Sequence, residues 1–181
     1  MTPLAGTQLE ERKGVVTFKG SPLTLLGPAL KPGQPAPDFR VLGQDLSEVM
    51  MAEFQGRPLL ISVVPSLDTA VCDQQTRRFN EAAAQLDGVA VLTVSMDLPF
   101  AQKRWCGAAG IDRIRVVSDH REATFGAAYG VLVKELRLLT RSVFVIDARG
   151  AITHVEIVPE MTTHPDYDAA IAAAKKAAGG A

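Results

Sequence analysis

Three residues between positions 65 and 72 have the types and spacing that thiol chemistry needs: Pro65, Thr69 and Cys72. The apolar run over residues 59–64 predicts a buried strand, and Pro65 ends it because proline has no N–H to give to a sheet. A helix is predicted to follow, with Asp68 or Thr69 as its N-cap. Cys72 then lies in the first helical turn, where free N–H groups and the helix dipole favour a thiolate.

A nucleophilic thiolate also needs a cation or further donors nearby. The Thr69 hydroxyl is one helical turn before Cys72, within reach of the sulfur. Arg77 and Arg78 are candidate cations on the same helix, and each also fits a solvated charge. Arg141 precedes the apolar strand over residues 142–146 and would lie near Cys72 if that strand neighbours the one over 59–64. The alternative for Cys72 itself is a small, buried, inert side chain.

The string from Pro65 to Cys72 resembles the PxxxTxxC motif of the peroxiredoxins, and its Asp-Thr pair resembles the thiol peroxidase subfamily. The resemblance extends over nearly the whole chain. Further matching strings lie at residues 15–26, 77–80, 97–107, 128–131, 141–147 and 162–167. Their occurrence together, in this order, is more specific than any one of them.

The resemblance implies an atypical two-cysteine peroxiredoxin, in which Cys72 is peroxidatic and Cys106 is resolving. Pro65, Thr69 and Arg141 would complete the active site. The implied cycle reduces hydrogen peroxide and organic hydroperoxides through a Cys72 sulfenic acid and an intramolecular Cys72–Cys106 disulfide. Thioredoxin would reduce that disulfide, the chain would form a homodimer, and no cofactor would be required.

Cys106 has its own local features. Lys103 and Arg104 precede it and give a basic setting that would favour its thiolate. Its alternative is a core cysteine beside Trp105. A disulfide needs Cα atoms within about 7 Å, so two cysteines on separate helices predict a local rearrangement during the cycle.

Composition excludes several classes of function. The 181 residues suit one domain, and 47% hydrophobic against 22% charged residues indicates a globular chain. A net charge of −1 and 6% aromatic residues give no basic or stacking surface for nucleic acid, and no apolar run is long enough for a membrane span. Residues 1–14 lack a signal-peptide pattern, so a cytoplasmic location is expected. No metal site is expected, because the three histidines are scattered and none is at ligand spacing from an acidic residue or a cysteine: His120, His154 and His164.

The elements that must position these residues alternate between strands and helices. Strands are predicted over residues 59–64, 89–96, 114–117, 142–147 and 151–157. Helices are predicted over residues 69–86, 99–109, 122–129 and 165–178. This order favours a single α/β domain over residues 1–181, with a mixed sheet between helices. It is compatible with a thioredoxin-like fold, which the family resemblance implies.

The segment before residue 59 is less regular. Residues 13–27 predict a small hairpin, treated as an appendage, followed by a proline-rich ordered surface loop over 28–37. Residues 39–46 suit a short extended segment with Ser47 as a cap. Residues 1–12 receive no role.

Three functional readings remain at this point. The first is a thiol-dependent peroxidase. The second is a redox sensor or interaction protein that uses the same disulfide as a switch. The third is a structural α/β domain whose two cysteines are inert, and Pro65, Thr69 and Cys72 in register count against it.

Overall fold

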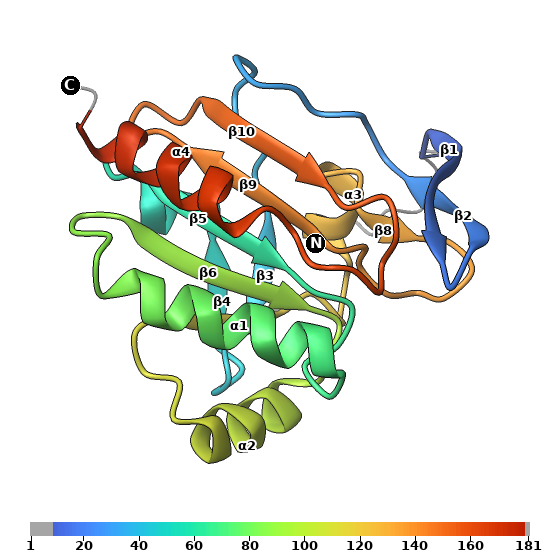
Figure 1. Cartoon of the computed structure of the whole chain (residues 1–181), viewed down its shortest axis with the longest axis horizontal. Helices are drawn as coiled ribbons and strands as arrows, with labels where there is room; N and C mark the ends of the chain where they lie inside the picture. The colour runs from blue at the N-terminus through green and yellow to red at the C-terminus, as the bar shows by residue number, and fades with distance from the viewer. Residues whose placement is uncertain (1–8, 180–181) are drawn as a thin grey trace.

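The computed structural model describes residues 9–179. Its centre is a seven-stranded mixed sheet (Figure 1). The strands are β3 (Arg40–Leu42), β4 (Glu48–Met50), β5 (Leu59–Val63), β6 (Ala90–Ser95), β7 (Arg115–Ser118), β9 (Ser142–Ile146) and β10 (Ile152–Ile157). They lie in the order β10-β9-β5-β6-β7-β3-β4. In the middle of the sheet β5 pairs in parallel with β6 and antiparallel with β9, so the predicted mixed sheet is confirmed.

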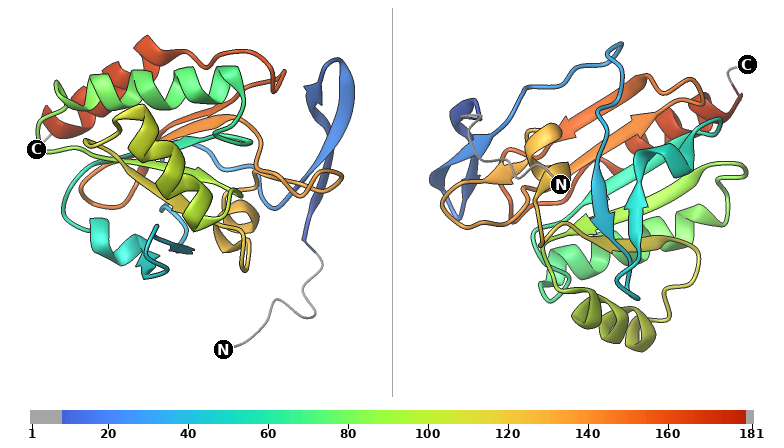
Figure 2. Two further views of the ribbon diagram at one scale, coloured as in Figure 1. Left: turned by 90° about the horizontal axis from the view of Figure 1, so that it is seen from below. Right: turned by 180° about the vertical axis from the view of Figure 1, so that it is seen from behind.

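Helices cover both faces of this sheet (Figures 1 and 2). They are the 3-10 helix η1 (Met51–Phe54) and the α-helices α1 (Ala70–Ala83), α2 (Pro99–Ala109), α3 (Thr124–Ala128) and α4 (Tyr167–Gly179). Successive side chains of a strand point to opposite faces. Leu60 therefore packs in the cluster that holds α1 and α4, whereas Leu59 and Ile61 pack in the cluster that holds α3 and η1. This burial on both sides explains why every residue of β5 is buried and all but Ser62 are apolar.

The N-terminal hairpin forms a separate three-stranded sheet. It consists of β1 (Glu11–Phe18), β2 (Ser21–Leu26) and β8 (Leu132–Val133). The turn is the two-residue pair Lys19-Gly20, with φ of 49° and 81°. Positive φ at both central residues gives the backbone twist that suits tight hairpins. The predicted hairpin is confirmed, and β1 begins at Glu11, before the predicted bounds of residues 13–27.

Several predicted boundaries differ from the structure. The helix that starts after residue 69 ends at Ala83 rather than at Leu86. Ser47 caps no helix, so that prediction is wrong: its hydroxyl donates to the Asp45 carboxylate at 2.6 Å, in the turn between β3 and β4. β4, η1 and β8 were not predicted, because elements of two to four residues are too short to show a periodic pattern.

From sequence alone, residues 1–12 receive no role. Residues 1–8 of this segment lie outside the described part, but Arg12 has a structural role. Arg12, in β1, donates from Nε to the Gly27 carbonyl at 2.9 Å and from its guanidinium to the Gly130 carbonyl. Gly130 follows α3 with φ of 65°, the left-handed conformation that commonly ends a helix. A side chain there would also collide with the Pro28 carbonyl. Arg12 therefore ties the hairpin to the end of α3.

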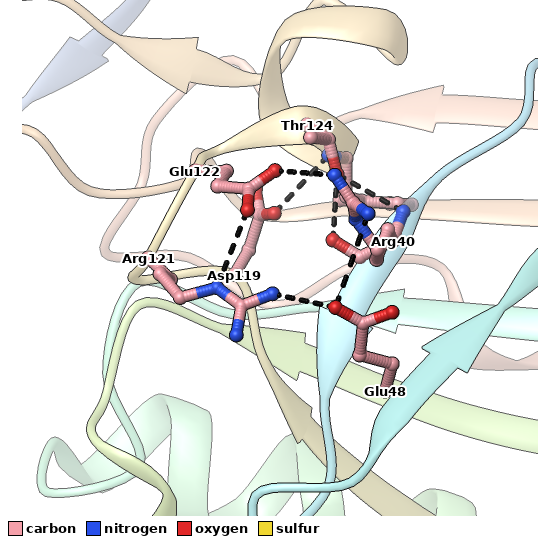
Figure 3. A network of polar contacts seen from close by, with 7 residues as sticks. Arg40, Glu48, Asp119, Arg121, Glu122 and Thr124 are labelled. Carbon is pink, nitrogen blue, oxygen red and sulfur yellow. Dashed lines mark hydrogen bonds and ion pairs between the residues drawn. The ribbon is translucent and has the colours of Figure 1, made fainter. Parts of the chain in front are cut away.

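A polar network joins β3 and β4 to the loop after β7 (Figure 3). Arg40 and Arg121 both pair with Glu122, at 2.9 and 3.3 Å, and Arg121 also pairs with Glu48 at 2.9 Å. These ion pairs are partly exposed, so each contributes little to stability. Asp119 in the same region is buried. Its carboxylate accepts the backbone N–H groups of Phe125 and Gly126 at the start of α3.

The buried Asp119 predicts a pH-dependent stability. Burial, the largest effect, raises the pKa of this carboxyl to about 7. In the unfolded chain an aspartate titrates near ~4. Between these values the folded state holds a proton that the unfolded state has lost, so stability falls as pH rises through the interval. We expect the unfolding free energy to decrease by about 4 kcal/mol from the acid end to the alkaline end of this interval. Urea unfolding at several pH values measures this decrease in the unfolding free energy. The Asp119→Asn variant should show a flatter pH dependence. An unchanged pH dependence in that variant would assign the effect to other groups.

Every helix within residues 9–179 falls short of the length and apolar character that crossing a bilayer requires.

Candidate active site

Cys72 is the third residue of α1, and its side chain has no solvent exposure. Thr69 occupies the N-cap position in an extended conformation, but its hydroxyl caps no backbone N–H. Instead its Oγ1 lies 2.8 Å from Cys72 Sγ and 3.1 Å from the Ser66 carbonyl. A hydroxyl has one proton to give, so a negatively charged sulfur would be its preferred acceptor.

Arg141 reaches the same sulfur from a distant part of the sequence. It directly precedes β9, which pairs with β5 in a register that sets Ser142 opposite Val63. The pairing therefore brings Arg141 to the end of β5, from which the chain leads to Cys72. One guanidinium nitrogen, Nη2, lies 3.3 Å from Cys72 Sγ. Only 2% of Arg141 is exposed, so its charge acts with little solvent screening.

Two partners that sequence reasoning missed hold this guanidinium. Gln75 accepts from Arg141 Nη1 at 2.7 Å, and its own amide donates to Ser62 Oγ in β5 at 2.8 Å. The Met161 carbonyl accepts from Arg141 Nε and Nη2 at 3.0 and 2.8 Å. Gln75 is one turn after Cys72 on the same helical face, a spacing that could have drawn attention to it. A backbone carbonyl carries no such signal in the sequence.

Asp97 holds the segment that leads from β5 to α1. Pro65 is buried and lies two residues after the end of that strand. The next two residues both donate to the Asp97 carboxylate, Ser66 from its hydroxyl at 2.7 Å and Leu67 from its N–H at 2.8 Å. Asp97 lies two residues before α2, so the loop before Cys72 is anchored at the entrance to the helix that carries Cys106.

The structure does not place Arg77 or Arg78 at the sulfur. Arg77 pairs with Asp73 at 2.8 Å and donates to the Ala109 carbonyl. Arg78 lies over the Tyr167 ring, with its guanidinium carbon 4.3 Å from the ring centre. Offsets of five and six residues rotate a side chain by about 140° and 240° around a helix, away from Cys72.

Cys106 lies in α2 and is mostly buried. It belongs to the same apolar cluster as Cys72, together with Val64, Leu67 and Val116. Neither cysteine is in a disulfide. Lys103 and Arg104 are exposed, and the polar group at the Cys106 sulfur is Gln44 Nε2 at 3.2 Å. Burial raises the pKa of the Cys106 thiol, against the basic setting expected from sequence. A hollow of about 460 Å³ reaches Cys106 between the β3–β4 turn and β7.

These contacts define what the site can do. Thr69 and Arg141 direct donors at one sulfur, an arrangement that stabilises negative charge on Cys72 or on an atom leaving it. Within residues 9–179, no three His, Cys, Asp or Glu side chains gather in a way that would hold a metal ion. Two of the histidines have hydrogen-bond partners of their own: His120 Nδ1 lies 2.9 Å from Ser118 Oγ, and His164 Nδ1 lies 2.7 Å from the Tyr167 hydroxyl.

Comparison with known proteins places this geometry in a family. The Redoxin family model matches residues 31–171. A thiol peroxidase of Halalkalibacterium halodurans is 61% identical over 162 residues, which cover 90% of this chain and 98% of that protein. A thiol peroxidase of Bacillus subtilis is 57% identical over 160 residues, which cover 88% of this chain and 96% of that protein. The crystal structure of a peroxiredoxin-like protein from Aquifex aeolicus superposes with a TM-score of 0.85 at 42% identity, covering 94% of this chain and 99% of that one. The chain therefore belongs to the redoxin family and, within it, to the thiol peroxidases of the peroxiredoxin group, with their thioredoxin-like fold.

Proposed function

We propose that this chain is a thiol-dependent peroxidase that reduces hydrogen peroxide and organic hydroperoxides at Cys72. The observation that carries the proposal is the pair of donors at Cys72 Sγ, the Thr69 hydroxyl at 2.8 Å and the Arg141 guanidinium at 3.3 Å. The curated relatives are named thiol peroxidases, which supports the same activity. Pro65, two residues after β5, contributes by keeping the chain from continuing as a strand, so that α1 starts at Ala70 and brings Cys72 beside Arg141.

The first step is a displacement at oxygen. The Cys72 thiolate forms an S–O bond to the nearer peroxide oxygen, the O–O bond breaks, and the farther oxygen leaves with the electron pair. The products are a Cys72 sulfenic acid and, after protonation, water or an alcohol. Charge that moves from sulfur to the leaving oxygen stays within reach of Thr69 and Arg141, so the same donors serve the ground and transition states.

The second step joins the two cysteines. The Cys106 thiol gives up its proton and attacks the Cys72 sulfur, an S–S bond forms, and the hydroxyl leaves as water. Both cysteines lie inside regular helices, so we expect turns of α1 or α2 to unwind before the bond can close. Superposable backbones in the reduced and disulfide forms would contradict this expectation.

A dithiol must then restore the enzyme. Thioredoxin is the proposed reductant, and its two thiols would be oxidised to a disulfide as Cys72 and Cys106 are reduced. A cycle that depends on this exchange suits a reducing compartment, so a cytoplasmic location is proposed. A homodimer is proposed as well, on the family resemblance. We also propose that residues 1–181 form a single domain and that the cycle uses the two cysteines without a cofactor.

Turnover tests the proposal. In the presence of thioredoxin, its reductase and NADPH, the protein should consume many equivalents of hydroperoxide per chain. A redox sensor would consume one equivalent and stop, and an inert domain would consume none. Either of these outcomes would remove the peroxidase function.

Replacing Arg141 by lysine should slow the first step. Lysine keeps the positive charge but cannot bond Gln75, the Met161 carbonyl and the Cys72 sulfur together, as the planar guanidinium does. We expect the second-order rate constant with peroxide to fall by about 10²-fold. Stopped-flow measurement of the reduced protein gives this constant directly.

Arg78→Lys is the matched control. Arg78 is on the same helix as Cys72 but lies at the surface over Tyr167, so its replacement should change the rate by less than about twofold. Equal rates for Arg141→Lys and the unmodified protein would remove Arg141 from the site.

A further inference from the structure

The N-terminal hairpin contacts the loop that follows β10, at the same end of the molecule (Figure 1). Thr17, near the end of β1, makes two backbone bonds to this loop. Its N–H donates to the Pro159 carbonyl at 2.7 Å, and its carbonyl accepts from the Met161 N–H at 2.9 Å. Thr17 and Glu160 thus form a short parallel bridge. The hairpin is therefore joined to this loop by backbone hydrogen bonds.

The Glu160 carboxylate fastens the tip of the hairpin to the same loop. One oxygen accepts from Thr17 Oγ1 at 2.7 Å and from the Gly20 N–H at 3.0 Å. The other accepts from the Lys19 N–H at 3.0 Å and from the N–H and hydroxyl of Thr162 at 3.1 and 2.7 Å. Five donors on one carboxylate make a fixed junction between the β1–β2 turn and the loop.

Met161 lies between these anchored residues. Its side chain is buried, its N–H is held by Thr17, and its carbonyl accepts the two bonds from Arg141. A shift of the loop would move this carbonyl, and the guanidinium that it holds would move relative to Cys72 Sγ. A continuous series of hydrogen bonds therefore links Thr17 of the hairpin, through Met161 and Arg141, to Cys72 Sγ.

We propose that the N-terminal hairpin is a positioning element of the active site, with Glu160 and Thr17 as its positioning residues. They fix the Met161 carbonyl, which orients Arg141 on Cys72. The proposal rests on the peroxidase function argued above. It corrects the description of the hairpin as an appendage and predicts that residues far from Cys72 in sequence set its reactivity.

Glu160→Gln tests this proposal. Glutamine keeps the size of the side chain but turns one oxygen into an NH₂ group, which would then face N–H donors at the hairpin turn. We expect the rate constant of the peroxide step to fall by about tenfold, because small displacements of catalytic groups have large effects on rate. Thr17→Val, which removes one hydroxyl donor to Glu160, should lower it in the same direction.

Glu135→Gln is the matched control. Glu135 is also a surface glutamate that grips the hairpin, accepting the Thr24 N–H at 3.1 and 3.0 Å, but it is not part of the path to Arg141. Its variant should keep the peroxide rate within about twofold, the size of effect that surface contacts usually have.

Coupling to Arg141 separates positioning from general destabilisation. If Glu160 acts through Arg141, the Glu160→Gln change should have little further effect on the rate in an Arg141→Lys background. The pH profile of Cys72 alkylation should also shift in Glu160→Gln and stay in place in Glu135→Gln.

Three results would overturn the proposal: equal rates in Glu160→Gln and the unmodified protein, equal losses in the two glutamate variants, or additive effects of Glu160→Gln and Arg141→Lys. An unmodified protein that consumes no peroxide would instead contradict the proposed function.

Discussion

Replacing Cys72 by serine is expected to abolish peroxide consumption. The fold should persist, because a serine Oγ fits the same space and accepts the same bonds from Thr69 and Arg141. The chemistry should not persist, because a serine hydroxyl stays protonated near neutral pH and is a poor nucleophile toward oxygen. We expect the rate constant with peroxide to fall by at least about 10³-fold, as is usual when a nucleophile is removed.

Circular dichroism and thermal unfolding should show that the Cys72→Ser variant is folded. Cys106→Ser is its natural comparison, because it removes the other thiol and leaves the first step intact. Residual turnover of Cys72→Ser near that of the unmodified protein would show that another group reacts with peroxide.

Replacing Cys106 by serine is expected to stop the enzyme after one equivalent of hydroperoxide. The Cys72 sulfenic acid should form at nearly the normal rate, since Cys106 is outside the set of donors at Cys72. Without a second thiol in the chain it cannot become an intramolecular disulfide. Turnover with thioredoxin should therefore fall by about 10²-fold or more, while a carbon nucleophile such as a dimedone reagent traps the sulfenic acid.

An excess of peroxide should carry Cys72 of this variant on to the sulfinic acid, which mass spectrometry detects. Sustained turnover of Cys106→Ser at the normal rate would contradict the resolving role of Cys106. It would indicate that the external thiol attacks the sulfenic acid directly.

Local sequence predicted the parts of the site that depend on short-range geometry. Thr69 and Cys72 are one helical turn apart, so a strand, a proline and an N-cap were enough to predict that they meet. For Arg77 and Arg78 the structure bears out the alternative of a solvated charge, because the helix turns side chains five and six residues after Cys72 away from its sulfur.

Long-range contacts required knowledge of the sheet. Arg141 reaches Cys72 because β9 pairs with β5, and the sequence gives the two apolar runs but not which neighbour each strand takes. The Met161 carbonyl was beyond sequence reasoning, since every residue has one. The pKa of Cys106 was misjudged because neighbouring charges in the sequence, Lys103 and Arg104, turn to solvent while the sulfur is buried.

The hairpin shows the same limit at the level of an element. Its two strands and turn were predicted from residues 13–27, because two short, largely apolar segments around a Gly and a Pro are a local pattern. Its contacts with Glu160 join segments about 140 residues apart in sequence, as Lys19 and Gly20 illustrate. No feature of the hairpin's own sequence indicates Glu160 as its partner, so local sequence predicts an appendage.

One mass measurement decides whether the two-cysteine cycle operates in this protein. The reduced protein is mixed with one equivalent of hydroperoxide, quenched within seconds, and analysed by intact mass and peptide mapping. We expect the loss of two hydrogens and a linked peptide that contains Cys72 and Cys106. Oxygen added at Cys72 without linkage would contradict the resolving role of Cys106, and an unchanged mass would contradict the peroxidase itself.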